Sequence, residues 1–466
     1  MTQASGGLWS PERRDLTGGL VLTVTLIAAE ALAISTAMPI VTRELGHLEL
    51  YGWVFSAFFL GSLIGIAIVG SLIDERGVIL PFAAGLVLFG IGLAVGGAAP
   101  SMEVLVAARF VQGLGGGALP PVAYVAIGRS LPERLRPSMF ATLSTAWILP
   151  GILGPAIAGI VAETIGWRWI FLGLLPLIVG SGFVALRALR TMVADDRVST
   201  SADASAGRVA LNRRQRWGPT VVLGGGAAIL MAGLTEGSPL VLVVLVGVGL
   251  TLTAAALSRL TPPGTLRLAR GVPTAVLLRG VVTFAFFSVN AYVALMLVEV
   301  RGWSAAAAGI ALTAATLSWT AGSWTQARLS RRLRPEWFVR RGFPVVALGT
   351  AALGSVLLPD VPAWVSIPAF AVAGFGMGLT YAQFALIILR DVPKDGQGAA
   401  TAGLSLTDAL GAALGTGIAG AMIAAAVRAG GGPGPGLAAA IALGAAVAVL
   451  GFLLAPRLHP PGAEIP

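Results

Sequence analysis

Three charged side chains stand out because they lie inside long apolar stretches of the sequence. Glu30 and Asp408 are carboxylates, and Arg109 is a guanidinium, each surrounded by runs of small and apolar residues. If such runs cross a membrane, an arginine near the centre costs at least ~2.5 kcal/mol on insertion scales. A carboxylate there is protonated much of the time, because desolvation penalises its charged form. Uptake and release of a proton is therefore the chemistry that these residues suggest.

Each of these residues has more than one interpretation. Glu30 is either a proton-coupling site or a structural glutamate that is permanently neutral or ion-paired. Arg109 faces a cavity or a carboxylate, or else it snorkels to the membrane surface. Asp408 shares a helix face with Thr401 and Ser405, at positions i, i+4 and i+7. It is a second proton-coupling site, a partner for Arg109 or a cation ligand, and a purely structural role is the alternative.

Other kinds of site chemistry find little support. The chain has no cysteine, and its two histidines, His47 and His459, are far apart in sequence. We therefore expect no metal site and no cofactor other than the proton as coupling ion, and we do not expect an enzyme.

The elements that hold these residues are predicted to be transmembrane helices. Of the 466 residues, 56% are hydrophobic and only 11% are charged, and the mean hydropathy is +0.87. Apolar runs longer than about 18 residues recur, which is the length needed to cross a bilayer. Only a helix satisfies its own backbone in lipid over such lengths. We predict fourteen spans, at 18–42, 51–72, 79–98, 104–128, 138–162, 168–188, 218–235, 238–258, 276–298, 304–327, 342–358, 363–389, 398–426 and 436–456.

The distribution of basic residues predicts how the chain is oriented. With the N-terminus inside, the inner loops hold most arginines, including the clusters Arg187 to Arg216 and Arg328 to Arg341, and the outer loops hold four. Arg279 falls at the inner edge of a span. The net charge of +10 therefore indicates membrane orientation and no nucleic-acid partner. We expect a multi-pass protein of the bacterial inner (plasma) membrane with both termini cytoplasmic.

The polar stretch 189–217 divides the spans into groups. We predict a six-helix bundle in 1–188, a cytosolic linker in 189–217, an extra helix pair in 218–260 and a second six-helix bundle in 261–466. The extra pair has little polar content, so a scaffolding role is expected for it. The first apolar run lacks the features of a cleaved signal peptide and is expected to be retained as a span.

A short motif joins the second and third spans. It runs from Gly70 through Asp74 and Arg76 to Gly77, and it resembles the signature loop of the major facilitator superfamily, G-x-L-x-D-r-x-G. Gly70 suits close helix packing, Gly77 suits a tight turn, and Asp74 suits a helix cap or an arginine partner. The resemblance implies a latch for the outward-open state. Glu75 and the apolar residues after Gly77 depart from the basic family pattern, and an ordinary charged hairpin is the alternative.

Two further motifs lie in spans 4 and 5. The sequence from Arg109 through Gln112 resembles the family element R-x-x-Q-G-x-G. Span 5 resembles the element g-x-x-x-G-P-x-x-G-G associated with exporters, although Pro150 and Ala158 replace two glycines. Small residues four apart allow close helix contact, and a proline bends the helix. Generic small-residue packing is the alternative, and the residues that match the element are Gly151, Gly154, Pro155 and Gly159.

The sequence around Glu30, with a proline nine positions later, is similar to the first span of fourteen-helix drug:proton antiporters, which usually carry aspartate there. Six plus six spans with an extra pair also match that family. The resemblance implies alternating access, in which a proton enters at Glu30 or Asp408 and an amphipathic small molecule leaves. A lipid or glycolipid exporter and a nutrient importer are the alternatives of the same fold, and a membrane enzyme is the alternative of another class. The fold is expected to work as a monomer among membrane lipids.

Weaker candidates complete the predicted site. Glu299 is expected to form a local ion pair with Arg301, and Gln326 stands at the acidic position of a degenerate second copy of the loop motif. Other polar residues within the spans are candidates to line a substrate cavity: Gln112, Asn290, Tyr292, Thr316, Tyr381 and Gln383.

Overall fold

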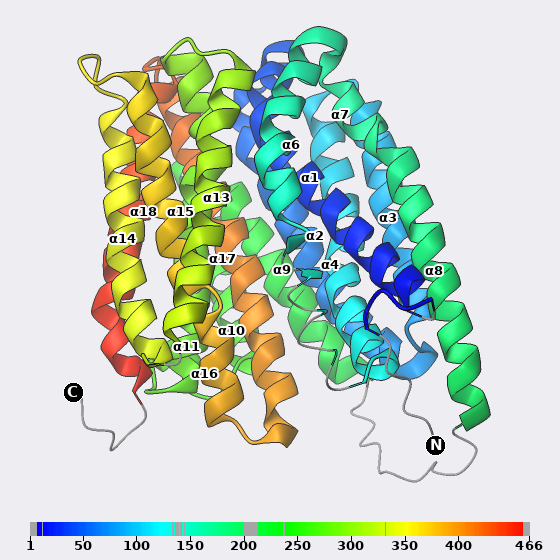
Figure 1. The fold of residues 1–466 in the computed structure, drawn as a ribbon. Coiled ribbons are helices and arrows are strands. Elements are labelled where there is room, and N and C mark those ends of the chain that lie inside the picture. The colour runs from blue at the N-terminus through cyan, green and yellow to red at the C-terminus, as the bar shows by residue number, and fades with distance from the viewer. Residues whose placement is uncertain are drawn as a thin grey trace.

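The computed structural model of the chain is helical throughout its described part (Figure 1). The described residues are 7–459, apart from 12, 133–134, 136–138, 140–141, 144, 200–212, 236–237 and 331. The helices run roughly parallel to one another, and the two ends of the chain lie at the same end of the molecule. We call that end the terminal face. The opposite end, where the first helix finishes at Leu45, we call the distal face.

The first half of the chain forms one bundle. The sequence between its loops is almost free of charge and can therefore lie in lipid. In lipid the backbone N–H and C=O groups must pair within the segment, which a long helix achieves. The elements are α1 (Arg14–Leu45), η1 (Leu48–Leu50), α2 (Tyr51–Arg76), α3 (Ile79–Gly97), α4 (Met102–Ser130), α6 (Ile148–Val161), the π-helical turn η3 (Ala162–Gly166), α7 (Arg168–Leu172) and α8 (Leu174–Ser199).

A helical pair follows, and then the second bundle. The pair is α9 (Arg213–Thr235) and α10 (Pro239–Leu260). The second bundle contains η4 (Thr265–Arg267), α11 (Val272–Asn290), α12 (Val293–Leu295), the π-helical turn η5 (Met296–Val300), α13 (Ala305–Leu329), α14 (Pro335–Ser355), η6 (Ala363–Val365), α15 (Ser366–Thr380), α16 (Gln383–Asp391), α17 (Lys394–Arg428), α18 (Pro433–Leu454) and η7 (Ala455–Leu458).

The described residues contain 12 helical segments that are long and apolar enough to cross a membrane, where the sequence predicted fourteen spans. The two remaining predicted spans coincide with α9 and α14. The apolar part of α9 is short, Gly218–Leu234. The first turns of α14 carry Glu336, Arg340 and Arg341, which lower its hydropathy. The chain is thus a multi-pass membrane protein. The middle of the predicted linker, 200–212, lies outside the described residues.

In two spans of the second bundle, the regular helical hydrogen bonding is interrupted by a two-residue turn whose backbone angles stay in the helical region, and we call each turn a helix break. The span that starts with α11 turns at Ala291 and Tyr292 before α12, and the span that starts with α15 turns at Tyr381 and Ala382 before α16. Backbone of this kind is tolerated at membrane depth only where protein or an internal cavity surrounds it. The sequence predicted continuous spans here, and in both cases a tyrosine occupies the break.

The two bundles meet along α6 and α13. A Cβ atom added at Gly159 would lie 2.5 Å from Cα of Ala306, and one added at Gly309 would lie 2.9 Å from the carbonyl oxygen of Pro155. One at Gly151 would meet the Thr316 side chain at 2.4 Å. The close contact expected of the span 5 element is present, and it joins one bundle to the other.

Polar contacts close the distal face. Nε of Arg43 on α1 donates to Oε1 of Glu299 at 2.7 Å, and the Tyr51 hydroxyl donates to the Ala291 carbonyl at 3.2 Å. The rings of Tyr51 and Tyr292 stack with their centroids 5.3 Å apart. The local ion pair predicted between Glu299 and Arg301 is wrong. Arg301 instead donates to three carbonyl groups in the loop after α14, those of Val356, Leu358 and Val361.

The helical pair α9 and α10 contacts both bundles through apolar side chains. Leu223, Ala227 and Met231 of α9 share one buried cluster with residues of both bundles. The α2 members are Leu60 and Leu63, and the α17 members are Leu406, Ala409, Leu410 and Ala413. In Figure 1, α9 accordingly lies between α2 and α17. The pair therefore covers one side of the junction between the bundles.

The α6–α13 contact predicts that two glycines of the same helix differ in their tolerance of a methyl group. Gly159→Ala should destabilise the fold by about 1–3 kcal/mol, because the new Cβ meets the backbone of α13. Gly154→Ala should not, since its Cβ would meet only Leu32 at an ordinary 3.8 Å. Thermal unfolding of the detergent-purified variants measures both effects. Equal losses of stability would contradict this account of the contact.

Candidate functional site

A fully buried ion pair occupies the middle of the first bundle. Glu30 lies near the midpoint of α1 and is 0% exposed, and Arg109 on α4 is 2% exposed. One guanidinium nitrogen of Arg109, NH1, donates to Oε1 of Glu30. Of the interpretations left open by the sequence, Arg109 therefore faces a carboxylate, and the snorkelling alternative is wrong.

The Arg109 side chain also ties three helices together. Its NH1 donates to Oε1 of Gln112 at 2.6 Å, and its Nε donates to the carbonyl oxygen of Val54 on α2 at 3.2 Å. The guanidinium carbon lies 4.4 Å from the centroid of the Phe58 ring. Because Arg109 and Gln112 are three residues apart, they share one face of α4. The charge is thus held by α1, α2 and α4 together.

Two buried polar atoms of this cluster lack a hydrogen-bond partner among the described residues. They are Oε2 of Glu30 and Nε2 of Gln112. A buried polar atom without a partner costs about 1–3 kcal/mol. Such an atom at a carboxylate is a position where a proton can be added without displacing an existing donor.

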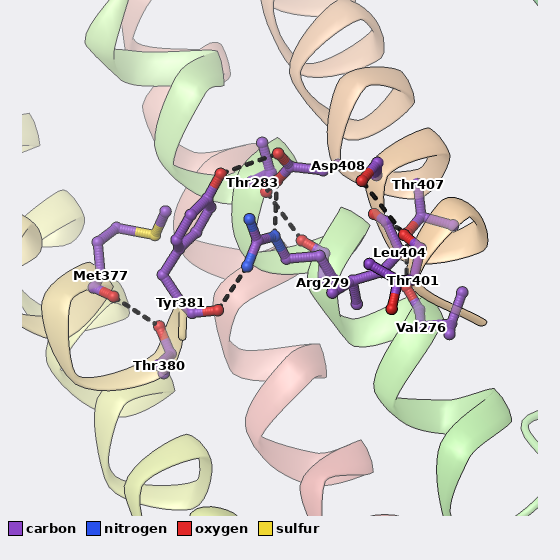
Figure 2. Close-up of polar contacts among 11 residues, drawn as sticks. Val276, Arg279, Thr283, Met377, Thr380, Tyr381, Thr401, Leu404, Thr407 and Asp408 are labelled. Atoms are coloured by element: carbon purple, nitrogen blue, oxygen red, sulfur yellow. Dashed lines mark hydrogen bonds and ion pairs between the residues drawn. The ribbon is translucent and has the colours of Figure 1, made fainter. Parts of the chain in front are cut away.

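A second ion pair lies in the second bundle, where Figure 2 shows Asp408 of α17 facing Arg279 of α11. Oδ1 of Asp408 accepts from Nε of Arg279 at 2.8 Å and from the Thr283 hydroxyl at 2.6 Å. Oδ2 accepts from the Tyr381 hydroxyl at 2.9 Å. The structure therefore assigns Arg279 as the partner of Asp408, and the predicted alternative of a pair with Arg109 is wrong.

The helix break at Tyr381 supports this second pair. Arg279 donates through NH1 to the Tyr381 carbonyl oxygen at 2.5 Å, and its guanidinium carbon lies 3.1 Å from the centroid of the Tyr381 ring. Figure 2 shows the tyrosine presenting its hydroxyl to Asp408 and its carbonyl to Arg279. The edge of the Trp319 ring packs against Tyr381, with centroids 5.2 Å apart. The break thus supplies two of the groups that surround the ion pair.

The other candidate residues fall in several places. Tyr292 donates to the Thr416 carbonyl at the distal contact between the bundles. Asn290 is half-buried at the end of α11, and Thr316 lies in the α6–α13 contact. Gln383 is buried and donates to Gln326 within the second bundle. These residues therefore do not gather into one site.

The loop motif is described only in part. Helix α2 ends at Arg76, whose side chain is exposed, and Gly77 follows with a φ of 72°. The tight turn expected at Gly77 is therefore present, since a positive φ favours glycine. The side chains of Asp74 and Glu75 and the surroundings of Gly70 lie outside the described part of the chain, so the latch stays a prediction.

Sequence reasoning missed the role of Arg279. A signal for it existed, because Asp408 is the one acidic residue well inside a span of the second half. An arginine placed deeper in its helix than expected requires a carboxylate partner. The contact of Trp319 with Tyr381 could not be predicted from the sequence, because it depends on how α13 is rotated against α15.

The described residues contain no group of three or more His, Asp and Glu side chains close enough to hold a metal ion. In each bundle, an arginine faces one carboxylate. The arrangement can bind and release protons at a carboxylate and can orient charged groups, both within the membrane-spanning region.

Comparison with known proteins places this geometry in context. The model of the Major Facilitator Superfamily matches residues 20–416. A probable multidrug-efflux transporter of Mycobacterium tuberculosis is 28% identical over 429 residues, which cover 88% of this chain and 86% of that protein. An MFS-type transporter of the acurin A biosynthesis cluster of Aspergillus aculeatus is 34% identical over 215 residues, or 45% of this chain and 37% of that protein.

Solved structures resemble the fold at low sequence identity. A crystal structure of a D-xylose-proton symporter superposes with a TM-score of 0.64 at 15% identity, covering 98% of both chains. A bacterial homologue of the human lysosomal transporter Spinster, solved in an inward-facing and unoccupied conformation, gives a TM-score of 0.61 at 16% identity. That match covers 96% of this chain and 98% of the other. At these identities, the likeness shows the fold alone.

The buried pair predicts strong energetic coupling between Glu30 and Arg109. Glu30→Gln and Arg109→Gln each leave a buried group without its partner, which costs about 3–5 kcal/mol when a charge remains. The double variant removes both charges, so it should be at least ~2 kcal/mol more stable than the sum of the single losses predicts. Thermal unfolding of the four proteins at one pH measures the coupling. Additive losses would show that the two side chains do not depend on one another.

Proposed function

Because the chain belongs to the Major Facilitator Superfamily, we propose that it is a proton-coupled exporter that moves lipophilic or amphipathic small molecules by alternating access. The observation that carries the proposal is the Glu30–Arg109 pair, whose carboxylate is fully buried and has one oxygen without a donor in the described part of the chain. An antiporter needs such a group, because its protonation changes the charge balance inside the membrane. The relative named as a probable multidrug-efflux transporter supports the direction of transport and the class of substrate.

Of the two carboxylates, Glu30 is the better proton carrier. Its Oε2 has no donor within hydrogen-bonding distance among the described residues, so a proton can be added there without breaking an existing hydrogen bond. Both oxygens of Asp408 are already bound, by Arg279, Thr283 and Tyr381. Protonation of Asp408 would remove the negative charge that all three of these donors bind. We therefore assign proton exchange to Glu30 and a binding or structural role to Asp408.

Protonation of Glu30 would act on the helices through Arg109. The neutral acid no longer balances the guanidinium, whose remaining partners are Gln112, Val54 and the Phe58 ring. Since these groups belong to α2 and α4, a change at α1 alters how the three helices are held together. The membrane potential contributes about 2.3 kcal/mol per elementary charge per 100 mV. Proton binding from one side can therefore favour one of the two conformations.

The closed distal face fits a state that receives substrate from the cytoplasm. We infer that the terminal face is cytoplasmic, because the arginine-rich loops predicted for the inner side lie between helix ends at that face. Export then requires the Arg43–Glu299 pair and the Tyr51–Tyr292 stack to separate. The α6–α13 contact would open with them. The chain would work in the plasma membrane of a bacterium.

We further propose that α9 and α14 complete fourteen spans. Helix α14 packs against α15 and α18 as a full member of the second bundle, and α9 packs against α2 and α17. The lower hydropathy of α14 and the shorter apolar part of α9 are compensated where neighbouring helices cover them. The loop motif at Asp74 remains our candidate for the latch of the other conformation.

Proton movement driven by substrate tests the proposal. In proteoliposomes with an imposed pH gradient, purified protein should move protons when aromatic or amphipathic drugs are added. Glu30→Gln should abolish this movement, because the side chain can no longer exchange a proton. A pH-sensitive dye inside the vesicles gives the measurement.

Matched controls separate coupling from folding. Glu103→Gln changes an exposed glutamate at the start of α4, whose side chain is 58% exposed, and should leave proton movement intact. Asp408→Asn should transport more slowly, but its residual transport should still follow the pH gradient. Normal coupling in Glu30→Gln would refute the assignment. If no drug drives proton movement while labelled lipid is moved, the lipid exporter becomes the better account.

A further inference from the structure

We propose that Asp408, Tyr381 and Trp319 form the subsite that receives the ammonium group of a protonated amphipathic amine. The inference rests on the proposed export function and adds the chemical class of substrate and the residues that bind its charged end. It gives a function to the Arg279–Asp408 ion pair, which takes no part in proton exchange at Glu30.

The Asp408 carboxylate has room for one more donor. A carboxylate offers about four acceptor positions, and Arg279, Thr283 and Tyr381 together occupy three of them. Among the residues that the structure describes, Oδ2 has a single donor, the Tyr381 hydroxyl. The side chain of Asp408 is 25% exposed, whereas that of Arg279 is 10% exposed. The accessible end of the pair is therefore its negative end, and it presents an open acceptor.

Arg279 keeps other partners if a substrate weakens its hydrogen bond to Asp408. Its guanidinium also donates to the Tyr381 carbonyl and lies over the Tyr381 ring. If a substrate ammonium moves onto Asp408, these contacts still hold the arginine in place. An anionic substrate would instead need to reach the less exposed Arg279 past a carboxylate that repels it. The geometry favours a cation.

Aromatic rings continue from this site toward the other bundle. Trp319 packs against Tyr381 and against Phe286, with centroids 5.2 and 5.4 Å apart. Phe286 contacts Phe287, and Phe287 contacts Phe59 of α2 at 5.5 Å. Trp319, Phe287 and Phe59 are half-buried. The planar apolar body of an amine can lie on these rings while its charged end faces Asp408, since a cation beside an aromatic face is also stabilised.

The open acceptor distinguishes two kinds of cation. A protonated amine carries an N–H group that can donate to Oδ2, and a hydrogen bond to a charged group contributes about 1.5–3 kcal/mol. A quaternary ammonium has the same charge but no donor. The site should therefore prefer the protonated amine by roughly tenfold or more, since 1.4 kcal/mol corresponds to tenfold in affinity.

Binding of a matched pair of probes tests this inference. One probe carries a naphthalene ring and a dimethylaminopropyl tail that is protonated at neutral pH, and the other has one further N-methyl group. Fluorescence titration of detergent-purified protein gives both dissociation constants. The first probe should bind wild type about tenfold more tightly. Asp408→Asn should abolish the preference, and Asp408→Glu, which keeps the carboxylate, should retain it.

A tryptophan pair on one helix provides the matched control. Trp319→Ala should weaken the binding of both probes several-fold, because their rings lose a packing surface. Trp324 lies on the same helix, five residues further along and on a different side, and is 58% exposed. Trp324→Ala should leave both dissociation constants unchanged. Thermal unfolding of each variant verifies that it is folded.

The outcomes separate this inference from the proposed function. Equal affinity for the two probes, a preference that survives in Asp408→Asn, or equal effects of the two tryptophan variants would overturn it. Absence of binding by either probe, in protein that still exchanges protons for other drugs, would also overturn it and leave the proposed function intact. Absence of proton exchange with every drug would instead count against the proposed function.

Discussion

The buried pair between Glu30 and Arg109 is the interaction on which the first bundle depends. A guanidinium in the middle of a membrane protein is tolerated only with a counter-ion and satisfied donors. Here the counter-ion comes from α1, further acceptors come from α2 and α4, and an aromatic ring covers the charge. The packing of α1, α2 and α4 is therefore arranged around the charge of Arg109. In the proposed function, a change in protonation at Glu30 alters that packing through Arg109.

The second bundle holds a comparable pair with a different balance of partners. Asp408 has donors on both oxygens and is partly exposed, whereas Glu30 has a donor on one oxygen and is fully enclosed. In this account the enclosed carboxylate of Glu30 exchanges a proton. The partly exposed carboxylate of Asp408, which has three donors and one open acceptor position, receives a ligand that carries its own donor. In this account the two halves of the chain divide the work between them. The distal contacts and the α6–α13 contact then connect the two halves mechanically.

Much of the architecture follows from the sequence because hydropathy alone determines where a helix can cross a bilayer. The helical spans, the turn at Gly77 and the close packing at Gly151 and Gly159 were all predictable from residue type and spacing. The count of spans was less predictable, because α14 carries charges in its first turns and is recognised as part of the bundle only by its neighbours.

The partners of charged side chains were harder to predict than the helices. Glu299 pairs with Arg43, which is 256 residues away in the chain, in preference to Arg301 two residues away. Asp408 pairs with an arginine on α11 and with a tyrosine at a helix break. Such pairs depend on the rotation of each helix and on where a helix is interrupted. Spacing within one helix carries no information about either.

The central claim is that Glu30 is the carboxylate that gains and loses the proton. Infrared difference spectroscopy measures this directly, because a protonated carboxylic acid has a C=O stretching band that the carboxylate lacks. When the pH is lowered across the range in which the protein is active, the account predicts a new band from a buried acid in wild type and in Asp408→Asn, and its loss in Glu30→Gln. A band that persists in Glu30→Gln and disappears in Asp408→Asn would contradict the account.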